Sequence, residues 1–503
     1  MPNVRVMLMV AIWLGNVLPA VDSTLLGTAL PTIIGQLGGL NLYGSVVAIN
    51  LLTNTTGVLI FGKLSDLYGR KPFFLLGVTL YLVGNVLCGL VQSIEQLILC
   101  RAIVGVGLGA VIPMGMTIMA DAFAVSVRAR VQWIFATTWL GSSIVCPALA
   151  SFVIMNASWR MVFFLPVPLA LGAFILLWRE YHEHIERREH SIDFLGAGLM
   201  TAGVVSLLMA LSPGGRGGIS FGDPVLMMAL AIVLLALFVW NELHVAEPLV
   251  PLKLVFSRVV GISVALAFVT GVIQFGANSY LPLFAQGAQG GTSANAAAAL
   301  APLTIGWPIA AGVGGFLLLR WGYRTSIRLG MTIVAIGISS LVFIDRHTPL
   351  PLEMAIMFFS GTGFGFTNVA SMLVVQEMVE WHQRGVVTGS VQFARSIGGS
   401  IGVAVMGALL TWHMAPVIET QTGGQGGNVT SYLLDPTIRN SLAPDVLLTL
   451  QQELALALHN VFVLMAGAAV LGFIAAYAFP HIPLKRSEPE AVVEAEVAAT
   501  EPV

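Results

Sequence analysis

Asp22 is the acidic residue that lies deepest inside an apolar stretch of this chain. The chain has 25 Asp and Glu residues, and the others fall in polar segments or at the edges of apolar ones. A carboxylate held in hydrocarbon is costly to keep ionised, so it can take up and release a proton as its access to water changes. We therefore expect Asp22 to carry proton coupling. The alternative is a structural role, as a helix N-cap or a satisfied polar contact at a helix break near Pro19.

Two of the 23 basic residues also lie inside apolar stretches, Arg101 in 97–118 and Arg395 in 387–411. Arg101 has two interpretations. Its long stem could carry the guanidinium to the membrane surface, or its charge could take part in proton movement near Asp22. For Arg395, pairing with backbone carbonyls and a direct role in transport are both open.

Amide side chains at helical spacing predict a polar lining for a substrate cavity. Gln274 and Asn278 are four residues apart and would share one helix face, and Asn54 belongs to a similar pair in 45–62. With Arg395, these residues are the candidate cavity residues. Aromatic residues in 132–154 together with the carboxylate of Asp22 would suit an amphipathic cation.

The composition predicts an integral membrane protein. Hydrophobic residues make up 57% of the 503 residues and charged residues only 10%, whereas soluble domains have about 25% charged residues. The net charge of −2 provides no positive field that would attract nucleic acid. The three cysteines support no disulfide framework, and we expect neither a metal site nor a cofactor.

A helix that crosses a bilayer needs about 20 apolar residues. Stretches of this kind predict an all-α membrane protein with 14 transmembrane helices, at 7–34, 45–62, 73–92, 97–118, 132–154, 160–178, 194–212, 225–241, 259–282, 296–319, 327–344, 353–374, 387–411 and 458–479.

The polar segments between these stretches indicate how the chain is divided. Most Lys and Arg fall in alternate segments, so the positive-inside rule predicts that both termini are cytoplasmic. We expect a six-helix bundle at 1–178, a cytoplasmic linker with two extra central helices at 179–258, a second six-helix bundle at 259–482 and an acidic cytoplasmic tail at 483–503. The segment 412–457 is expected to be a long polar loop on the outside.

One cytoplasmic turn carries a specific motif, and a weaker echo of it follows at 320–324, which indicates pseudo-symmetry between the two bundles. The motif resembles the signature loop of the major facilitator superfamily, G-x-L-(A/S)-D-x-x-G-R-(K/R). Its positions are occupied here by Gly62, Leu64, Ser65, Asp66, Gly69, Arg70 and Lys71. Asp66 could pair with a base or cap a helix of the other half. The resemblance implies that this loop controls the conformational cycle.

Three further stretches resemble the fourteen-helix drug:proton antiporter branch of that superfamily. They are the runs that begin at Asp22, at Arg101 and at Arg384, the last of which contains Arg395. The antiporter motif of the fifth helix is degraded: Gly141 and Pro147 remain as candidate residues, but Cys, Ala and Ser stand where the family has glycines. The resemblance implies that Asp22 and Arg101 act together in proton coupling. The glycine series at 105–109 and 361–365 lie within apolar stretches and predict close helix contacts.

These features predict a secondary active transporter rather than an enzyme or a receptor. It would export small apolar or amphipathic, drug-like compounds in exchange for protons by alternating access. The alternative is a uniporter or symporter of a physiological organic solute or lipid without proton antiport, which the degraded motif favours. The expected partners are a small-molecule substrate, protons and the lipid bilayer. We expect a monomer, and family analogy places it in a bacterial inner membrane.

Overall fold

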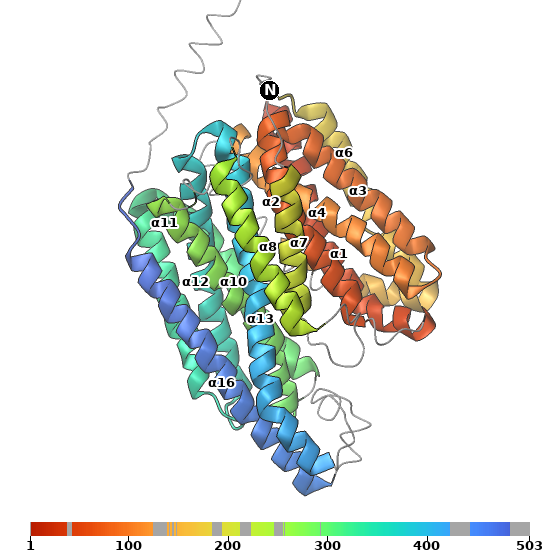
Figure 1. Cartoon of the computed structure of the whole chain (residues 1–503), viewed down its shortest axis with the longest axis vertical. Helices are drawn as coiled ribbons and strands as arrows, with labels where there is room; N and C mark the ends of the chain where they lie inside the picture. The colour runs from red at the N-terminus through yellow and green to blue at the C-terminus, as the bar shows by residue number, and fades with distance from the viewer. Residues whose placement is uncertain are drawn as a thin grey trace, which may run out of the picture.

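The computed structural model describes residues 2–37, 43–123, 148–183, 194–211, 223–245, 257–291, 293–422 and 443–482, together with 138, 139, 141, 142, 145, 146 and 255. These residues form helices and their connections, and they contain no β-strand. The longer helices lie side by side along the molecule (Figure 1).

The first part of the chain forms α1 (Pro2–Leu37), α2 (Tyr43–Tyr68), α3 (Arg70–Leu90), α4 (Ile94–Ala122), the 3₁₀ turn η2 (Trp159–Phe164), α6 (Val167–Glu180), α7 (Phe194–Leu211) and α8 (Pro224–His244). The second part forms α10 (Arg258–Leu283), the π-helical turn η3 (Phe284–Ala288), α11 (Ser293–Ser340), η4 (Leu341–Phe343), α12 (Leu350–Met378), η5 (Trp381–Gln383), α13 (Arg384–Thr422) and α16 (Pro444–Tyr477).

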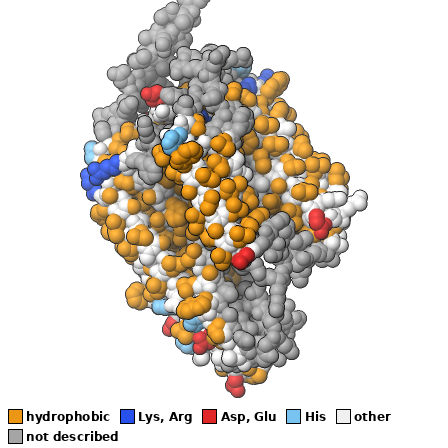
Figure 2. All heavy atoms as spheres, viewed as in Figure 1, with side chains coloured by type: hydrophobic (Ala, Val, Ile, Leu, Met, Phe, Trp, Pro, Cys, Tyr) orange, Lys and Arg blue, Asp and Glu red, His pale blue; other side chains and the backbone are white. Residues whose placement is uncertain are grey.

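Eleven helical segments among the described residues are long and apolar enough to cross a membrane. They belong to α1, α3, α4, η2 with α6, α8, α10, both parts of α11, α12, α13 and α16, while α7 contains a shorter apolar helix, Gly198–Leu207. Figure 2 shows one face of the molecule covered largely by hydrophobic side chains, with the charged ones towards the helix ends. Such a surface fits contact with lipid rather than with water.

Two buried hydrophobic clusters hold most of the helices together. One joins α1, α3, α4 and α6, and the other joins α10, α11, α12, α13 and α16. With α2, which packs on α4, we refer to the first set as the N-terminal half and to the second as the C-terminal half. A small third cluster joins α7 and α8 to residues of α2 and α13, so this helix pair packs at the junction of the halves.

The two glycine series make equivalent contacts in the two halves. In α4, a methyl group on Gly107 would lie 2.7 Å from the Gly77 carbonyl oxygen of α3. In α12, a methyl group on Gly363 would lie 2.6 Å from the Gly330 carbonyl oxygen of α11. Neighbouring glycines in each series contact α2 and the first part of α11 respectively. Each series therefore lets one helix pack between two others, as the sequence predicts.

A backbone turn at glycine is also repeated. Gly69, between α2 and α3, has φ 96° and ψ 157°. Gly322, which breaks the 48-residue α11 into two parts, has φ 78° and ψ 169°. Residues with a Cβ rarely adopt a positive φ, so both turns require glycine. The expected apolar stretches 296–319 and 327–344 are thus joined by one sharp turn.

The prediction that 412–457 is a polar loop is wrong at both ends. Helix α13 continues to Thr422 and α16 begins at Pro444. The two helices project together beyond the rest of the molecule, at the bottom of Figure 1. His413 Nε2 lies 3.3 Å from Glu453 Oε2 and links them. These segments are too polar to be recognised from hydropathy, but helix–helix packing stabilises them.

Candidate functional site

Asp22 and Arg101 form a bidentate ion pair inside the N-terminal half. Arg101 Nη1 donates to Asp22 Oδ1 at 2.8 Å, and Nη2 donates to Oδ2 at 2.6 Å. Helix α1 supplies the acid and α4 supplies the base. Asp22 is 4% exposed and Arg101 is fully buried. Paired parallel hydrogen bonds of this kind are among the strongest that proteins form.

This geometry excludes two of the interpretations that the sequence left open. Asp22 lies within the continuous helix α1, so it is not an N-cap. The guanidinium of Arg101 contacts Asp22 and does not reach a surface, because Arg101 is fully buried.

The surroundings of the pair are tightly packed and partly polar. Tyr81 and Asn85 of α3 are both buried, and the hydroxyl oxygen of Tyr81 has no hydrogen-bond partner among the described residues. The adjoining cavity has a volume of about 10 Å³ and is lined by Asp22, Leu25, Leu26, Asn85, Val162, Phe163 and Pro166. A single water needs about 10–15 Å³. The pair is therefore nearly sealed from water in this conformation.

The motif loop joins the two halves at one end of the molecule. Asp66 Oδ1 accepts a hydrogen bond from the Gly385 N–H at 3.0 Å, and Oδ2 accepts one from the Val386 N–H at 2.8 Å. These donors belong to the first turn of α13, where the helix dipole favours an anion. Gly62 allows the close approach, since a methyl group there would lie 3.0 Å from the Gly385 carbonyl oxygen.

Arg70 reinforces this junction from the start of α3. Its Nη2 donates to the Trp381 carbonyl oxygen at 2.6 Å, and its guanidinium lies 3.8 Å from the centroid of the Trp381 ring. Its Nη1 lies 3.1 Å from Asp121 Oδ2 of α4. Asp121 Oδ1 also accepts a hydrogen bond from Arg384 Nη1 at 3.1 Å. One carboxylate thus connects a base of each half.

Glu183 completes the cluster. Its carboxylate accepts hydrogen bonds from the backbone N–H groups of Arg70, at 2.9 and 2.8 Å, and of Lys71, at 3.0 Å. Lys71 Nζ donates to the Trp178 carbonyl oxygen at 2.7 Å. We call Asp66, Arg70, Asp121, Glu183, Trp381 and Arg384 the loop cluster.

The sequence indicated Asp66 and Arg70 of the loop cluster but not Asp121, Glu183 or Trp381. Each of these three is an ordinary polar or aromatic residue at the end of an apolar stretch, and no local spacing marks it. Arg384 was noted only as the start of a family motif, so its ion pair with Asp121 was not expected.

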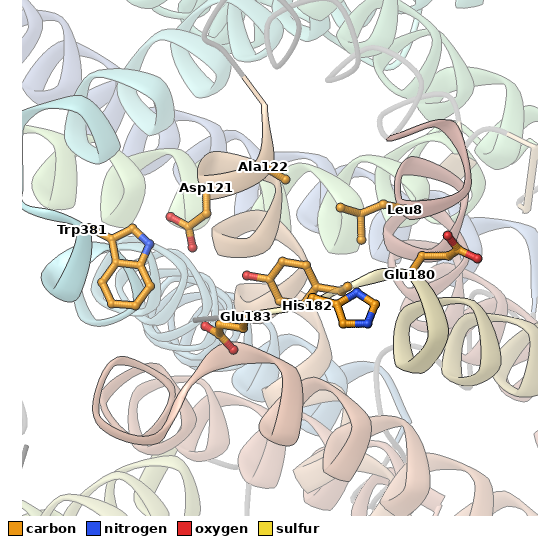
Figure 3. Close-up of a pocket in the computed structure, with 8 residues that line it drawn as sticks. Leu8, Asp121, Ala122, Glu180, His182, Glu183 and Trp381 are labelled. Atoms are coloured by element: carbon orange, nitrogen blue, oxygen red, sulfur yellow. The ribbon is translucent and has the colours of Figure 1, made fainter. Parts of the chain in front are cut away.

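A cavity of about 420 Å³ lies beside the loop cluster, lined by Leu8, Asp121, Ala122, Glu180, Tyr181, His182, Glu183 and Trp381. Figure 3 shows Asp121 and Trp381 close to each other at one end of it, and Leu8 and Glu180 at the other. Burial raises the pKa of Asp66, which lies beyond the apolar part of α2, to about 7. This effect exceeds the opposing effects of Arg70 and the two backbone N–H groups. A carboxyl group with a pKa near 7 gains or loses its charge around neutral pH. The hydrogen bonds that Asp66 makes between the two halves can therefore respond to pH.

The structure does not gather the predicted cavity residues into one group. Asn54 and Gln274 are half-buried, and Asn278 is exposed. Gly141 is also exposed, with open space around its Cα, and Pro147 lies outside the described residues. Among the described contacts, no hydrogen bond joins Asn54, Gln274 or Asn278 to another of these amides. Arg395 of α13 lies among small residues that pack on α10.

Comparisons with known proteins identify the family. The family model for the Major Facilitator Superfamily matches residues 12–403. The multidrug transporter protein MdtP of Bacillus subtilis (strain 168) is 31% identical over 425 residues, which cover 83% of this chain and 79% of that protein. Multidrug resistance protein 3 of the same organism is 31% identical over 420 residues, which cover 83% and 82%.

Solved structures share the fold at low sequence identity. The human organic anion transporter MFSD10 superimposes with a TM-score of 0.60 at 14% identity and covers 94% of this chain and 99% of its own. The proton:xylose symporter XylE gives a TM-score of 0.59 at 12% identity and covers 95% and 96%. The family model, the relatives and the helical architecture agree, and the chain belongs to the major facilitator superfamily.

Proposed function

We propose that this chain is a secondary active transporter that exports small apolar or amphipathic, drug-like compounds in exchange for protons. The observation that carries the proposal is the buried bidentate pair of Asp22 and Arg101. The relatives that are named as multidrug transporters support the class of substrate. Ionisable groups in a membrane interior are costly and usually serve function.

The pair provides a simple means of coupling. A proton on Asp22 removes the charge that Arg101 needs, and a buried ion pair that loses one partner is destabilised by about 3–5 kcal/mol. Protonation therefore favours a conformation in which Arg101 meets water or another anion. Loss of the proton restores the sealed pair. Alternating exposure of this site to the two sides of the membrane would couple proton entry to export.

The loop cluster supplies the second part of the mechanism. Asp66 holds the N-terminal half to the first turn of α13, and Arg70 holds it to Trp381 of η5, so the molecule is closed at this end. The charge distribution predicts that this end is cytoplasmic. Opening it requires the loss of these hydrogen bonds and of the Asp121–Arg384 ion pair.

The proposal includes the membrane arrangement expected from the sequence. Adding α2, α7 and the segment 132–154 to the eleven candidate spans gives fourteen transmembrane helices, with α7 and α8 as the extra pair. The two bundles would then be 1–178 and 259–482, with both termini cytoplasmic in a bacterial inner membrane. The transporter would work as a monomer, with a small molecule, protons and lipid as its partners.

A pH-jump assay on proteoliposomes tests this function. Purified wild type is compared with Asp22→Asn, and with Asp223→Asn as a control, because Asp223 is an exposed N-cap of α8. Wild type and the control should accumulate a fluorescent drug only while a proton gradient exists, and Asp22→Asn should lose this accumulation. Equal gradient-driven transport in Asp22→Asn would remove the coupling role. Transport by wild type that ignores the gradient would instead favour a uniporter.

A further inference from the structure

Arg395 of α13 is a half-buried cation in the C-terminal half that has no polar partner among the described residues. No hydrogen bond or ion pair joins its guanidinium to any described residue, and its Nε is buried and unsatisfied. The other basic residue inside an apolar stretch, Arg101, has both terminal nitrogens on Asp22. Within the part of the chain that the structure describes, Arg395 therefore differs from Arg101 in having no counter-charge.

The sequence contains no hidden acid that could supply this counter-charge from within the membrane. Across the fourteen apolar stretches, including 132–154, Asp22 is the only acid away from an end. Arg101 already neutralises Asp22. Glu353, at the start of α12, accepts a hydrogen bond from Gln289 at 2.5 Å. The interior thus carries one net positive charge, on Arg395.

The contacts of α13 place Arg395 between the two halves and near the middle of the membrane. Gln392, three residues earlier and on the same helix face, reaches Met116 of α4 in the other half, with 3.8 Å between Nε2 and Sδ. Arg395 is 10 residues beyond Gly385 of the loop cluster junction, roughly 15 Å along the helix. The hydrocarbon core is about 30 Å thick. This depth is about half the thickness of the hydrocarbon core.

Small residues on α10 and α13 bring the two helices together at this level. Gly271 of α10 packs against the backbone of Arg395, and the ring of Phe275 packs against Gly399. Gln274 and Asn278 share this face of α10 with Gly271 and Phe275. The aromatic ring of Phe275 thus lies on α10 at the level of α13 where Arg395 is placed, and this combination suits an aromatic compound with one polar end.

We propose that the transported compounds carry an acidic group, such as a carboxylate or sulfonate, that pairs with Arg395. The inference rests on the proposed transport function and names its substrate class. A guanidinium binds a planar or tetrahedral acid through two parallel hydrogen bonds, and the substrate then supplies the charge that the protein lacks. The amphipathic cation expected from the sequence is disfavoured, because the only interior carboxylate is already paired with Arg101.

The test uses three probes with one aromatic body and different charge: 8-anilinonaphthalene-1-sulfonate, the neutral N-phenyl-1-naphthylamine and a trimethylammonium derivative of the neutral compound. Binding to purified protein and gradient-driven transport are measured for wild type, Arg395→Gln and Arg395→Lys. Arg179→Gln is the matched control, since it removes the same charge from a side chain that is 78% exposed.

Wild type and Arg179→Gln should bind the sulfonate at least tenfold more tightly than the other two probes. Arg395→Gln should lose about tenfold to a hundredfold of the sulfonate affinity, as expected for charge-assisted hydrogen bonds, with little change for the neutral probe. Arg395→Lys should retain part of the affinity. Preference of wild type for the cation, or an equal loss for all probes in Arg395→Gln, would overturn the inference.

Two further readings separate the possible failures. If the sulfonate binds through Arg395 but the proton gradient drives transport of none of the probes, the proposed transport function is wrong and the binding site at Arg395 is supported. If neutral and cationic probes are exported and Arg395→Gln has no effect, the binding role of Arg395 is wrong and the proposed transport function is supported. Repeating the binding in phosphatidylcholine vesicles with and without phosphatidylglycerol distinguishes a free acid from a lipid headgroup. Loss of sulfonate preference only with the anionic lipid would identify the lipid as the ligand and overturn the substrate assignment.

Discussion

Gly69 and Gly322 adopt nearly the same left-handed backbone conformation, with φ 96° and ψ 157° in the first and φ 78° and ψ 169° in the second. Each turns the chain sharply between the second and third apolar helix of its half. The two halves therefore repeat this backbone feature. In the N-terminal half, Arg70 beside Gly69 also binds Glu183 and Trp381.

Alanine at these two positions separates fold from function. A Cβ at this φ costs about 1–3 kcal/mol, so Gly69→Ala and Gly322→Ala should lower stability by similar amounts in thermal unfolding of the detergent-solubilised protein. Gly69→Ala should additionally slow transport, because it displaces the Arg70 and Lys71 N–H groups from Glu183. Equal transport rates in the two variants at equal stability would contradict a special role of the first turn.

The Asp22–Arg101 pair can be measured by a double-mutant cycle. Asp22→Asn and Arg101→Gln each leave a buried partner unsatisfied, so each should destabilise the protein by about 3–5 kcal/mol. The double variant should recover much of this loss, giving a coupling energy of at least about 2 kcal/mol, yet it should remain unable to use a proton gradient. Thermal unfolding and the pH-jump assay provide the two readouts. Additive losses would mean that the pair is not formed in the folded protein.

The loop cluster should open more readily below neutral pH. Burial raises the pKa of Asp66 to about 7, so the carboxyl is ionised and binds the N-terminus of α13 above this pH, and it becomes neutral below it. The charged groups that act on Asp66 are Arg70 and Asp121, and these two are paired in turn with Glu183 and Arg384. A thiol-reactive probe on a cysteine placed at Ser65, which is fully buried at this junction, should react faster at pH 6 than at pH 8 once each rate is divided by the thiolate fraction at that pH. The same cysteine in Asp66→Asn should give a high corrected rate at both pH values.

Asp66 affects folding stability in the opposite direction: its protonation weakens the junction between the halves but favours the folded state. The unfolded carboxyl titrates near 4 and the folded one near 7, so the unfolded state loses its proton first. Asp66 should therefore lower the stability of wild type as the pH rises from 4 to 7 and have no further effect above 7. A pH series of unfolding curves for wild type and Asp66→Asn measures this, and parallel curves would show that Asp66 does not contribute.

Removal of the charge at position 395 should stabilise the protein without substrate. An unpaired guanidinium in the membrane interior is unfavourable by about 2–3 kcal/mol, so Arg395→Met should raise the unfolding temperature while abolishing binding of the sulfonate probe. Arg101→Met, which removes a paired arginine of the same type, should lower the unfolding temperature instead. A fall in both variants would indicate that Arg395 has a structural partner.

The parts that sequence could predict are those encoded by local composition. Hydropathy located most helices, and Asp22 was recognised as the single deep acid. The glycines at 105–109 and 361–365 indicated close packing because their spacing places them on one apolar helix. The motif loop was recognised because seven positions match within ten residues.

The parts that could not be predicted depend on contacts between distant segments. Asp121 and Glu183 resemble any acid at a helix end, and only the folded chain brings both to Arg70. The charge preference of the proposed binding site also depends on the folded structure. The sequence cannot show that Asp22 forms an ion pair with Arg101, or that Arg395 has no such partner among the described residues. The helical ends of 412–457 were missed because their stability comes from pairing with each other.

Helix α13 carries the Gly385–Asp66 junction at its first turn and Arg395 three turns later, with no break between them. A rigid rod of this length cannot rotate or tilt at one point without moving the other. A compound that pulls the guanidinium towards α4 would therefore strain the distant hydrogen bonds at Asp66. Binding of the compound and opening of the closed end would then occur together.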